Sequence, residues 1–226
     1  MGKNKLLHFA ENDTFPNFFQ PDFDEIRDGY AFKGSWRENF FRNPHPIILE
    51  LGCGKGEYTV GLAQKYPERN YIGLDKKGAR MWRGAKTSQE EQILNVAFLR
   101  IKIEQVGFCF GRHEVDEIWI TFPDPVPKKR REGRRLTSPK FLELYRYILK
   151  PGGMIHLKTD NQEFFEYTLN TTRESSFRLI YQTDDLYGSD FTGDAPSIQT
   201  HYEKTFLKEG LKINYLQLKF DDARSQ

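Results

Sequence analysis

The sequence has 226 residues, of which 38% are hydrophobic and 29% charged, and its formal net charge is +2 at pH 7. These values predict one soluble domain with a substantial core, and they exclude a membrane span, because no stretch approaches the roughly 18 to 20 apolar residues that a span requires. The chain begins without the pattern of a secretion signal, and Cys53 and Cys109 are too few for a disulfide framework and lack metal-ligand spacing, so we expect a reduced, cytoplasmic setting without a metal.

The first 46 residues are rich in Phe, Tyr and Trp and show no clear strand alternation. We interpret residues 1–46 as an arm or cap ahead of a main domain that spans 47–226. The aromatic side chains of this arm are expected to supply packing rather than a stacking platform, because side chains of this size contribute much of a core.

From residue 47 onward, short apolar runs alternate with helical patterns, which predicts parallel strands joined by crossover helices. Ser138 is a candidate N-cap with Pro139 at the first helical position, and KPGG after this helix is a stop signal. The predicted strands are 47–51, 71–75, 96–101, 117–121, 154–159, 177–183 and 212–220. The predicted helices begin near 57 and 200 and span 78–91, 138–149 and 162–174, with a short helix after 101 and a polar loop over 184–199.

The stretch ILELGCGKGEY is a strand that runs into Gly52, Gly54 and Gly56 and then into a helix. Glycines here let the backbone turn sharply and approach a ligand closely. The dinucleotide pattern G-x-G-x-x-G requires glycine at 57, where this chain has Glu57. Together with Glu50, this carboxylate disfavours a pyrophosphate and favours a cationic cofactor, which predicts S-adenosylmethionine.

Asp75 closes the second predicted strand, about 20 residues after the glycines, where an acidic side chain can accept hydrogen bonds from ribose hydroxyls. A tight turn without any ligand is the alternative reading of the glycine loop. Cys53 is interpreted as a small residue in that turn, because no activating base accompanies it.

Residues 121–136 read TFPDPVPKKRREGRRL and place Asp124 between two prolines, directly before the most basic part of the chain. The prolines restrict the backbone of Asp124 to extended or turn conformations. Residues 128–135 hold six Lys or Arg and one Glu, a net charge of +5, so the positive charge of the chain is local. We expect this run to bind RNA phosphates, with a solvated loop as the alternative.

Three stretches, ELGCGKG, TFPDPVPKKRREGRRL and HLKTD, with THYE at 200–203, together resemble the bacterial tRNA (guanine-N7-)-methyltransferase family. The resemblance covers roughly residues 34–218. It implies a Rossmann-like, seven-stranded α/β methyltransferase fold with helices on both faces of the sheet. It also implies S-adenosylmethionine as the methyl donor and N7 of guanine 46 in the tRNA variable loop as the acceptor.

The motifs carry site residues over to this chain. The implied cofactor-binding residues are Glu50, Gly52, Gly54, Asp75 and Asp124, of which Asp124 is also the catalytic candidate. The implied substrate-binding residues are Lys128, Asp160, Thr200 and Glu203, and the expected contacts to the RNA backbone are Lys129, Arg130, Arg131, Arg134 and Arg135. The chain differs from the family at Lys102, where most members have an acid that meets the adenine, with Glu104 two residues on, and at Val126, which replaces a tryptophan.

Several of these residues have a structural alternative. Asp124 either orients guanine and offsets its developing charge, or caps a turn. Asp160 either bonds guanine donors or serves as the N-cap of the helix that begins near Gln162. Thr200 and Glu203 have the spacing of a capping box.

Two rival functions stay open at this point. A non-catalytic RNA-binding protein on the same fold is one, and a nicotinamide-dependent oxidoreductase, which the acidic frame of the glycine loop argues against, is the other. The sequence does not decide between a monomer and a homodimer.

Overall fold

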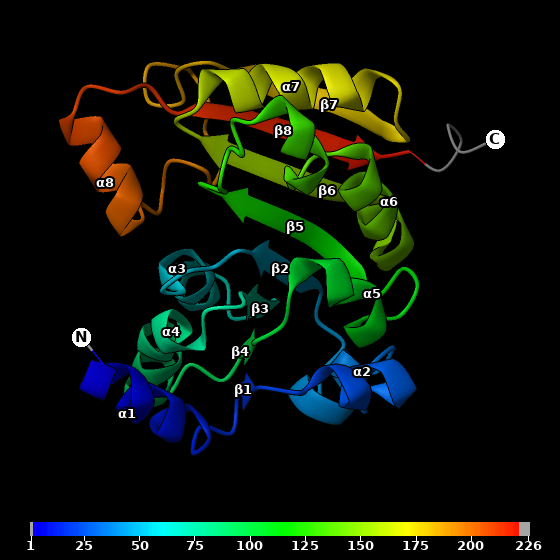
Figure 1. Ribbon diagram of the computed structural model, residues 1–226, viewed down its shortest axis with the longest axis vertical. Helices are drawn as coiled ribbons and strands as arrows, with labels where there is room; N and C mark the ends of the chain where they lie inside the picture. The colour runs from blue at the N-terminus through cyan, green and yellow to red at the C-terminus, as the bar shows by residue number, and fades with distance from the viewer. Residues whose placement is uncertain (1, 222–226) are drawn as a thin grey trace.

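Eight strands form one sheet in the computed structural model, which describes residues 2–221 (Figure 1). The strand order is β1-β4-β3-β2-β5-β6-β8-β7, and only β8 runs antiparallel to its neighbours. Chain order reverses between β2 and β5, and open α/β sheets bind ligands at the carboxyl ends of the strands beside such a reversal. The strands are β1 (Phe18–Phe19), β2 (Ile47–Leu51), β3 (Asn70–Leu74), β4 (Val96–Leu99), β5 (Val115–Thr121), β6 (Leu149–Thr159), β7 (Phe177–Thr183) and β8 (Asn214–Phe220).

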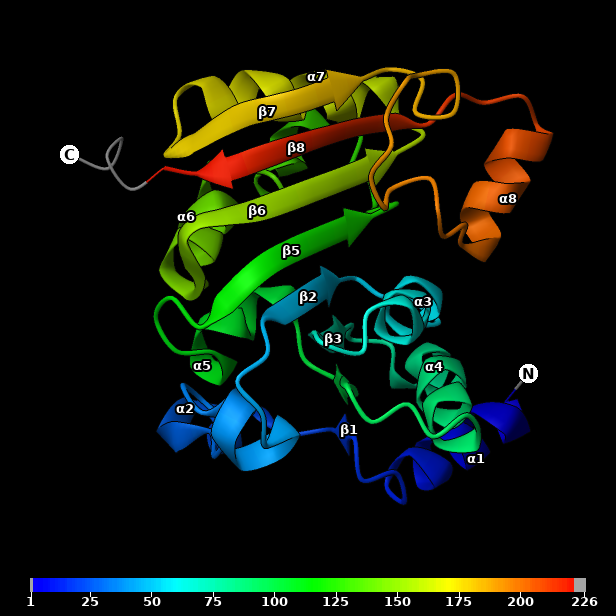
Figure 2. The same cartoon turned by 180° about the vertical axis from the view of Figure 1, so that it is seen from behind.

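Helices cover both faces of the sheet, as Figures 1 and 2 show from opposite sides. No helix within residues 2–221 is long and apolar enough to cross a bilayer. The α-helices are α1 (Gly2–Asn12), α2 (Phe23–Gly29), α3 (Glu57–Lys65), α4 (Gly78–Glu90), α5 (Val106–Cys109), α6 (Pro139–Ile148), α7 (Gln162–Arg173) and α8 (His201–Lys208). Short helical segments are η1 (Trp36–Phe41), η2 (Ile103–Gln105) and η3 (Lys129–Arg134).

The alternation of strands and helices after residue 47 is confirmed, but the expected count of seven strands is too low by one. The additional strand β1 pairs in parallel with β4, and Asn17 and Phe19 accept hydrogen bonds from the backbone N–H groups of Phe98 and Arg100 (2.8 Å each). Two residues are too few to show a period-2 pattern, so this edge strand cannot be recognised from its own residues.

Strand β6 also differs from its prediction, because it begins at Leu149 and runs through KPGG. The helix before it does end there, at Ile148, so the stop signal is confirmed while the strand starts earlier than expected.

The aromatic side chains before residue 47 pack, as expected, around Trp36, which is fully buried. Phe19, Phe32 and Phe40 meet its ring at centroid distances of 5.0 to 5.9 Å, and its indole N–H donates to the carbonyl of Cys109 (3.0 Å). The division of the chain at residue 46 stays a prediction, since this segment also contributes β1 to the common sheet.

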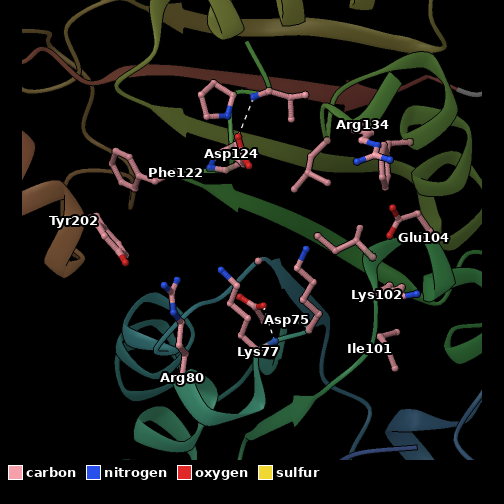
Figure 3. Close-up of a pocket in the computed structure, with 18 of the residues that line it drawn as sticks. Asp75, Lys77, Arg80, Ile101, Lys102, Glu104, Phe122, Asp124, Arg134 and Tyr202 are labelled. Atoms are coloured by element: carbon pink, nitrogen blue, oxygen red, sulfur yellow. Dashed lines mark hydrogen bonds between the residues drawn. The ribbon is translucent and has the colours of Figure 1, made fainter. Parts of the chain in front are cut away.

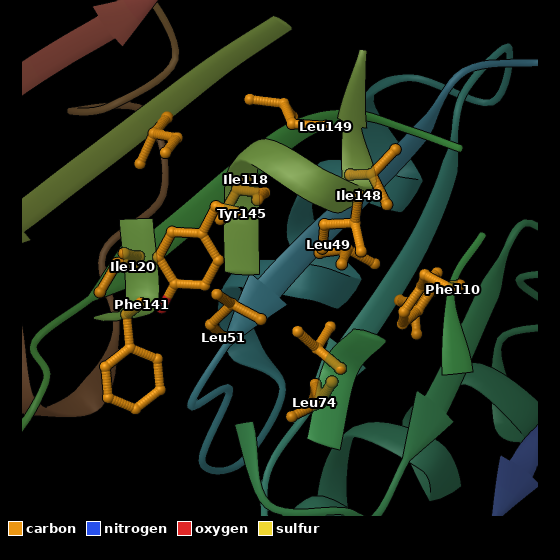
Figure 4. Packing of buried hydrophobic residues seen from close by; sticks show 14 of the residues in the cluster. Leu49, Leu51, Leu74, Phe110, Ile118, Ile120, Phe141, Tyr145, Ile148 and Leu149 are labelled. Atoms are coloured by element: carbon orange, nitrogen blue, oxygen red, sulfur yellow. The ribbon is translucent and has the colours of Figure 1, made fainter. Parts of the chain in front are cut away.

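A cluster of buried apolar side chains lies between α6 and the central strands β2 and β5 (Figure 4). Leu49, Leu51, Ile118 and Tyr145 are among its members and have no solvent exposure. Burying one such leucine or isoleucine stabilises the fold by about 1.5–3 kcal/mol. This packing fixes the two strands whose carboxyl ends carry the candidate site.

Candidate functional site

A cavity of about 820 Å³ lies at the carboxyl ends of the central strands (Figure 3). It brings together Gly52, Asp75, Asp124, Arg134 and Asp160, which lie in four separate stretches of the sequence. Its volume is within the range of about 300–1,000 Å³ typical of small-molecule sites. At this cavity three of the predicted cofactor residues, Gly52, Asp75 and Asp124, meet one predicted substrate residue, Asp160.

The glycine loop after β2 is bonded to the end of β3. The N–H groups of Gly52 and Cys53 both donate to the carbonyl of Leu74 (2.7 and 3.1 Å). Gly52 has a φ of 81° and lines the cavity, where an added Cβ would meet no atom, so the loop leaves room for a ligand. Position 56 requires glycine for a different reason: a Cβ there would lie 2.6 Å from the ring of Phe98.

Asp75 joins the glycine loop to the turn that follows β3. Its carboxylate accepts the backbone N–H of Gly54 (3.1 Å) on one oxygen and that of Lys77 (2.9 Å) on the other. A carboxylate can accept about four hydrogen bonds, so two acceptor positions stay available toward the cavity. Asp75 thus fits a ligand that offers hydroxyl donors, such as a ribose. Gly54 does not line the cavity.

Glu50 lies beneath the loop, buried, and does not line the cavity. Its carboxylate accepts from the backbone N–H (2.9 Å) and hydroxyl of Thr59 and from the hydroxyl of Thr121 (2.7 Å). Burial raises the pKa of Glu50 to about 7, although these hydrogen bonds oppose the rise. Its role as a cofactor ligand stays a prediction, because here it joins β2, α3 and β5 to one another.

Cys53 is buried and has no disulfide partner. Burial raises the pKa of its thiol well above the ordinary value, so the nucleophilic thiolate is disfavoured. This agrees with the interpretation of Cys53 as a small residue in a tight turn.

The Asp124 corner has an unusual backbone. Phe122 and Val126, on either side, have φ values of 49° and 46°, which residues with a Cβ rarely adopt and β-branched residues least of all. Asp124 accepts the N–H of Val126 (3.0 Å), which fixes one carboxylate oxygen, and its side chain is exposed at the cavity. Strained backbone of this kind is common at functional sites, where the surrounding structure holds it in place.

The basic run forms η3 and its flanks, and Lys128, Lys129, Arg130, Arg131 and Arg134 are exposed there. Of these, only Arg134 lines the cavity.

Arg135 is different, because its side chain is only 5% exposed. Its guanidinium donates to the carbonyl of Pro125 (3.1 Å), pairs with Glu163 (2.6 Å) and lies over the ring of Tyr167. In this conformation it braces the Asp124 corner and is not available to a phosphate, contrary to its expected contact with the RNA backbone.

Asp160 lines the cavity and does not cap α7. The N-cap is Asn161, whose side chain accepts the N–H of Phe164 (2.8 Å). The structural alternative for Asp160 is therefore wrong, and partial burial raises the pKa of its carboxyl.

Thr200 and Glu203 form the capping box of α8 that their spacing indicated. Glu203 is fully buried and pairs with the equally buried Lys158 of β6 (2.7 Å), while the hydroxyl of Tyr187 donates to the same carboxylate (2.8 Å). Neither capping residue lines the cavity, so their contact with the substrate stays a prediction. Their observed effect is to hold α8 beside the carboxyl ends of β5 and β6 (Figures 1 and 2).

Sequence reasoning missed an aromatic wall of the cavity. Tyr202 of α8 is 48% exposed and its side chain points toward the cavity (Figure 3). Phe122 and Phe206 also line the cavity, and the centroids of their rings lie 5.7 Å apart. Tyr202 lies inside the THYE motif and beside Glu203 on an amphipathic helix. This position was the signal from which its place at the cavity could have been predicted.

The cavity also has basic side chains that the sequence analysis did not single out, Lys76, Lys77 and Arg80 of the turn into α4. Lys102 and Glu104 both line the cavity as well, on the side where Ile101 lies (Figure 3). Within residues 2–221, no group of three His, Cys, Asp or Glu side chains has metal-binding geometry.

Known proteins resemble the chain in sequence. The family model described as "Putative methyltransferase" matches residues 44–216. A tRNA (guanine-N(7)-)-methyltransferase of Christiangramia forsetii is 49% identical over 96% of this chain and 98% of its own length. Proteins of the same name from Cytophaga hutchinsonii and Listeria monocytogenes are 43% and 38% identical over 97% and 87% of this chain, and over 99% and 90% of their own lengths.

Solved structures resemble the fold. The 16S rRNA methyltransferase KamB superimposes with a TM-score of 0.61 at 15% identity, over 90% of this chain and 94% of its own. A 16S rRNA (adenine(1408)-N(1))-methyltransferase of Catenulisporales acidiphilia, solved with S-adenosylmethionine, gives 0.55 at 15% identity over 89% and 92%. At these identities the likeness establishes the Rossmann-like methyltransferase fold, with one strand more than expected. The near full-length sequence matches establish more: the chain belongs to the tRNA (guanine-N7-)-methyltransferase family.

Proposed function

We propose that the protein transfers a methyl group from S-adenosylmethionine to N7 of guanine 46 in the variable loop of tRNA, in the cytoplasm. The names of the relatives support the guanine N7 reaction on tRNA, and the motifs quoted above support position 46. The observation that carries the proposal is the meeting of Asp75 and the glycine loop with Asp124 and Asp160 in one cavity.

The residues present fit this methyl donor. Gly52 leaves open space at the loop, the carboxylate of Asp75 suits ribose hydroxyls, and Ile101 adds an apolar surface for a flat base. Carboxylates at the cavity also suit a ligand that carries sulfonium and ammonium charges. When bound, the donor supplies an electrophilic methyl group.

The chemistry places modest demands on the protein, because N7 of guanine already carries an unprotonated lone pair at neutral pH. The side chains therefore act by alignment and by electrostatics rather than by removing a proton from N7. The purine gains positive charge as the N7–methyl bond forms. Asp124, held by Val126 at the cavity, offsets that charge or accepts hydrogen bonds from the guanine.

Two further groups suit a guanine in the cavity. Asp160 offers a second carboxylate for the N1–H and N2–H donors of the base. Tyr202 offers a ring on which the base can stack, an interaction worth about 1–3 kcal/mol per base in nucleic-acid complexes. Alignment of N7 with the methyl group follows when one face and one edge of the base are held.

The test uses two transcripts of one tRNA, one with guanine and one with adenine at position 46, each incubated with the protein and with methyl-labelled cofactor. We expect labelled 7-methylguanosine from the first transcript and no label in the second. Label in another nucleoside, or equal label in both transcripts, contradicts the proposal.

A further inference from the structure

Lys76, Lys77 and Arg80 form a basic lip on the α4 side of the cavity, which we call the α4 lip. All three side chains are exposed and line the cavity. No carboxylate of the described residues lies within ion-pair distance of them, whereas Lys65 and Lys86 nearby are paired with Asp194 and Glu11. Three unneutralised cations at the mouth of a site indicate an anionic partner.

We propose that the α4 lip is a second phosphate-binding surface, and that the RNA strand crosses the cavity between this lip and the basic segment η3. The proposal rests on the proposed function. It deepens that function by giving the RNA a path, with phosphates held on both sides of the target nucleotide.

The geometry places the two basic surfaces on different sides of the cavity. Figure 3 shows Lys77 from the turn before α4 and Arg80 from α4 itself reaching into it, with Asp124 on the facing wall and Arg134 at the far corner. A base that reacts inside the cavity has left its stack, so the phosphates before and after it lie at the rim. A lip on one side alone would hold only one of these phosphates.

The α4 lip is held rigidly. Asp75 accepts the N–H of Lys77 (2.9 Å), which fixes the turn that carries the lip. On the other side of α4, the side chain of Asn12 donates to the carbonyl of Gly78 (3.0 Å), and the ring of His8 stacks on Trp82 at 3.8 Å. Helix α1 thus braces the amino end of α4, whose 13-residue dipole adds partial positive charge at the lip.

The methyl donor does not account for this charge. S-adenosylmethionine has no phosphate and carries two positive groups against one carboxylate, so it does not need three cations. An RNA strand presents one negative charge per nucleotide and matches a row of basic side chains.

The experiment compares two triple variants that remove the same charge. One is Lys76→Gln, Lys77→Gln, Arg80→Gln; the matched control is Arg112→Gln, Arg173→Gln, Arg178→Gln, whose exposed side chains lie at the amino ends of β5 and β7. The dissociation constant for a tRNA transcript is measured over a series of salt concentrations. Affinity for S-adenosylhomocysteine is measured by calorimetry.

For the lip variant we expect the slope of log K against log salt to become shallower by about 2 to 3, since each lost phosphate contact contributes roughly 0.7–0.9. The control should keep the slope of the parent, and both variants should keep their affinity for S-adenosylhomocysteine within about twofold. An unchanged slope in the lip variant overturns the proposal. So does a loss of cofactor affinity with the slope intact, because the cations would then serve the cofactor.

Failure of the proposed function would give a different result. The parent protein would then leave guanine 46 unmethylated in the transcript test, whatever the salt slopes of the variants.

Discussion

Asp124 is the residue for which a structural role and a functional role predict the most different results. Among the described residues, the hydrogen bond that its carboxylate accepts comes from the N–H of Val126. An asparagine can keep this bond through its carbonyl oxygen, so Asp124→Asn removes the charge and leaves the corner intact.

We therefore expect Asp124→Asn to fold normally and to lower the single-turnover rate at saturating cofactor and tRNA by roughly a hundredfold, the usual scale for one electrostatic group at a reacting centre. Asp184→Asn, an exposed aspartate away from the cavity, is the matched control. A folded Asp124→Asn protein with the parent rate would assign the corner a purely architectural role.

Glu50 gives a prediction about pH. Because burial raises its pKa to about 7 from the ordinary value of 4.5, the folded protein binds a proton more tightly there than the unfolded chain does. Stability from this group is fully present below pH 4.5 and is lost as pH rises through about 7.

Urea unfolding of the parent and of Glu50→Gln at pH 5 and pH 8 measures this contribution. Relative to the glutamine variant, the parent should lose about 2 to 3 kcal/mol of unfolding free energy between the two pH values. A constant difference between the two proteins would show that Glu50 is ionised in the folded state throughout.

At the scale of elements, α8 and the segment before it depend on one buried ion pair. The ammonium of Lys158 pairs with Glu203 and also donates to the carbonyl of Ala195 (2.6 Å). This one side chain of β6 therefore connects the strand to α8 and to the loop that precedes α8. Burial lowers the pKa of Lys158, and Glu203 opposes that shift.

Glu203→Gln leaves this ammonium buried without its counter-charge, which should lower the free energy of unfolding by about 3–5 kcal/mol. Glu143→Gln, which breaks the surface pair with Arg146, should cost at most about 1 kcal/mol. Chemical denaturation measures both. Equal, small losses would mean that water enters the pair and that α8 is held by other contacts.

Segment η3 allows the exposed arginines to be separated from the buried one. Replacing Arg130, Arg131 and Arg134 by alanine should flatten the salt dependence of tRNA binding by about 2 to 3 in slope without affecting stability. Arg135→Ala should lower the stability of the protein and leave the salt dependence of tRNA binding unchanged, because it removes the hydrogen bonds to Pro125 and Glu163. Salt titrations and thermal melts of the two variants decide this, and exchanged outcomes would contradict the assignment.

At the scale of the whole molecule, the order of elements after residue 47 was predictable because each strand carries an apolar run and each helix a 3.6-residue period. Strand β1 was not predictable, since a two-residue edge strand is defined only by its partner β4. The strand ends that form the cavity were predictable for the same reason as the sheet: parallel strands end at one edge.

The sequence alone could not distinguish residues that contact a ligand from residues that stabilise the protein around the site. Glu50, Glu203 and Arg135 carry charges that suggest ligands, yet all three are buried and bonded to other parts of the protein. Arg80 belongs to no quoted motif, and Tyr202 has only its position inside THYE as a signal, yet both line the cavity. Burial depends on the packing of distant segments, which local spacing does not reveal.

One cavity is proposed to hold both the methyl donor and the guanine. A crystal structure of the protein bound to S-adenosylhomocysteine and a tRNA transcript tests this directly. We expect the ribose of the cofactor product at Asp75, and guanine 46 beside Asp124 with N7 facing the sulfur. A guanine bound outside the cavity, or a ribose away from Asp75, would contradict it.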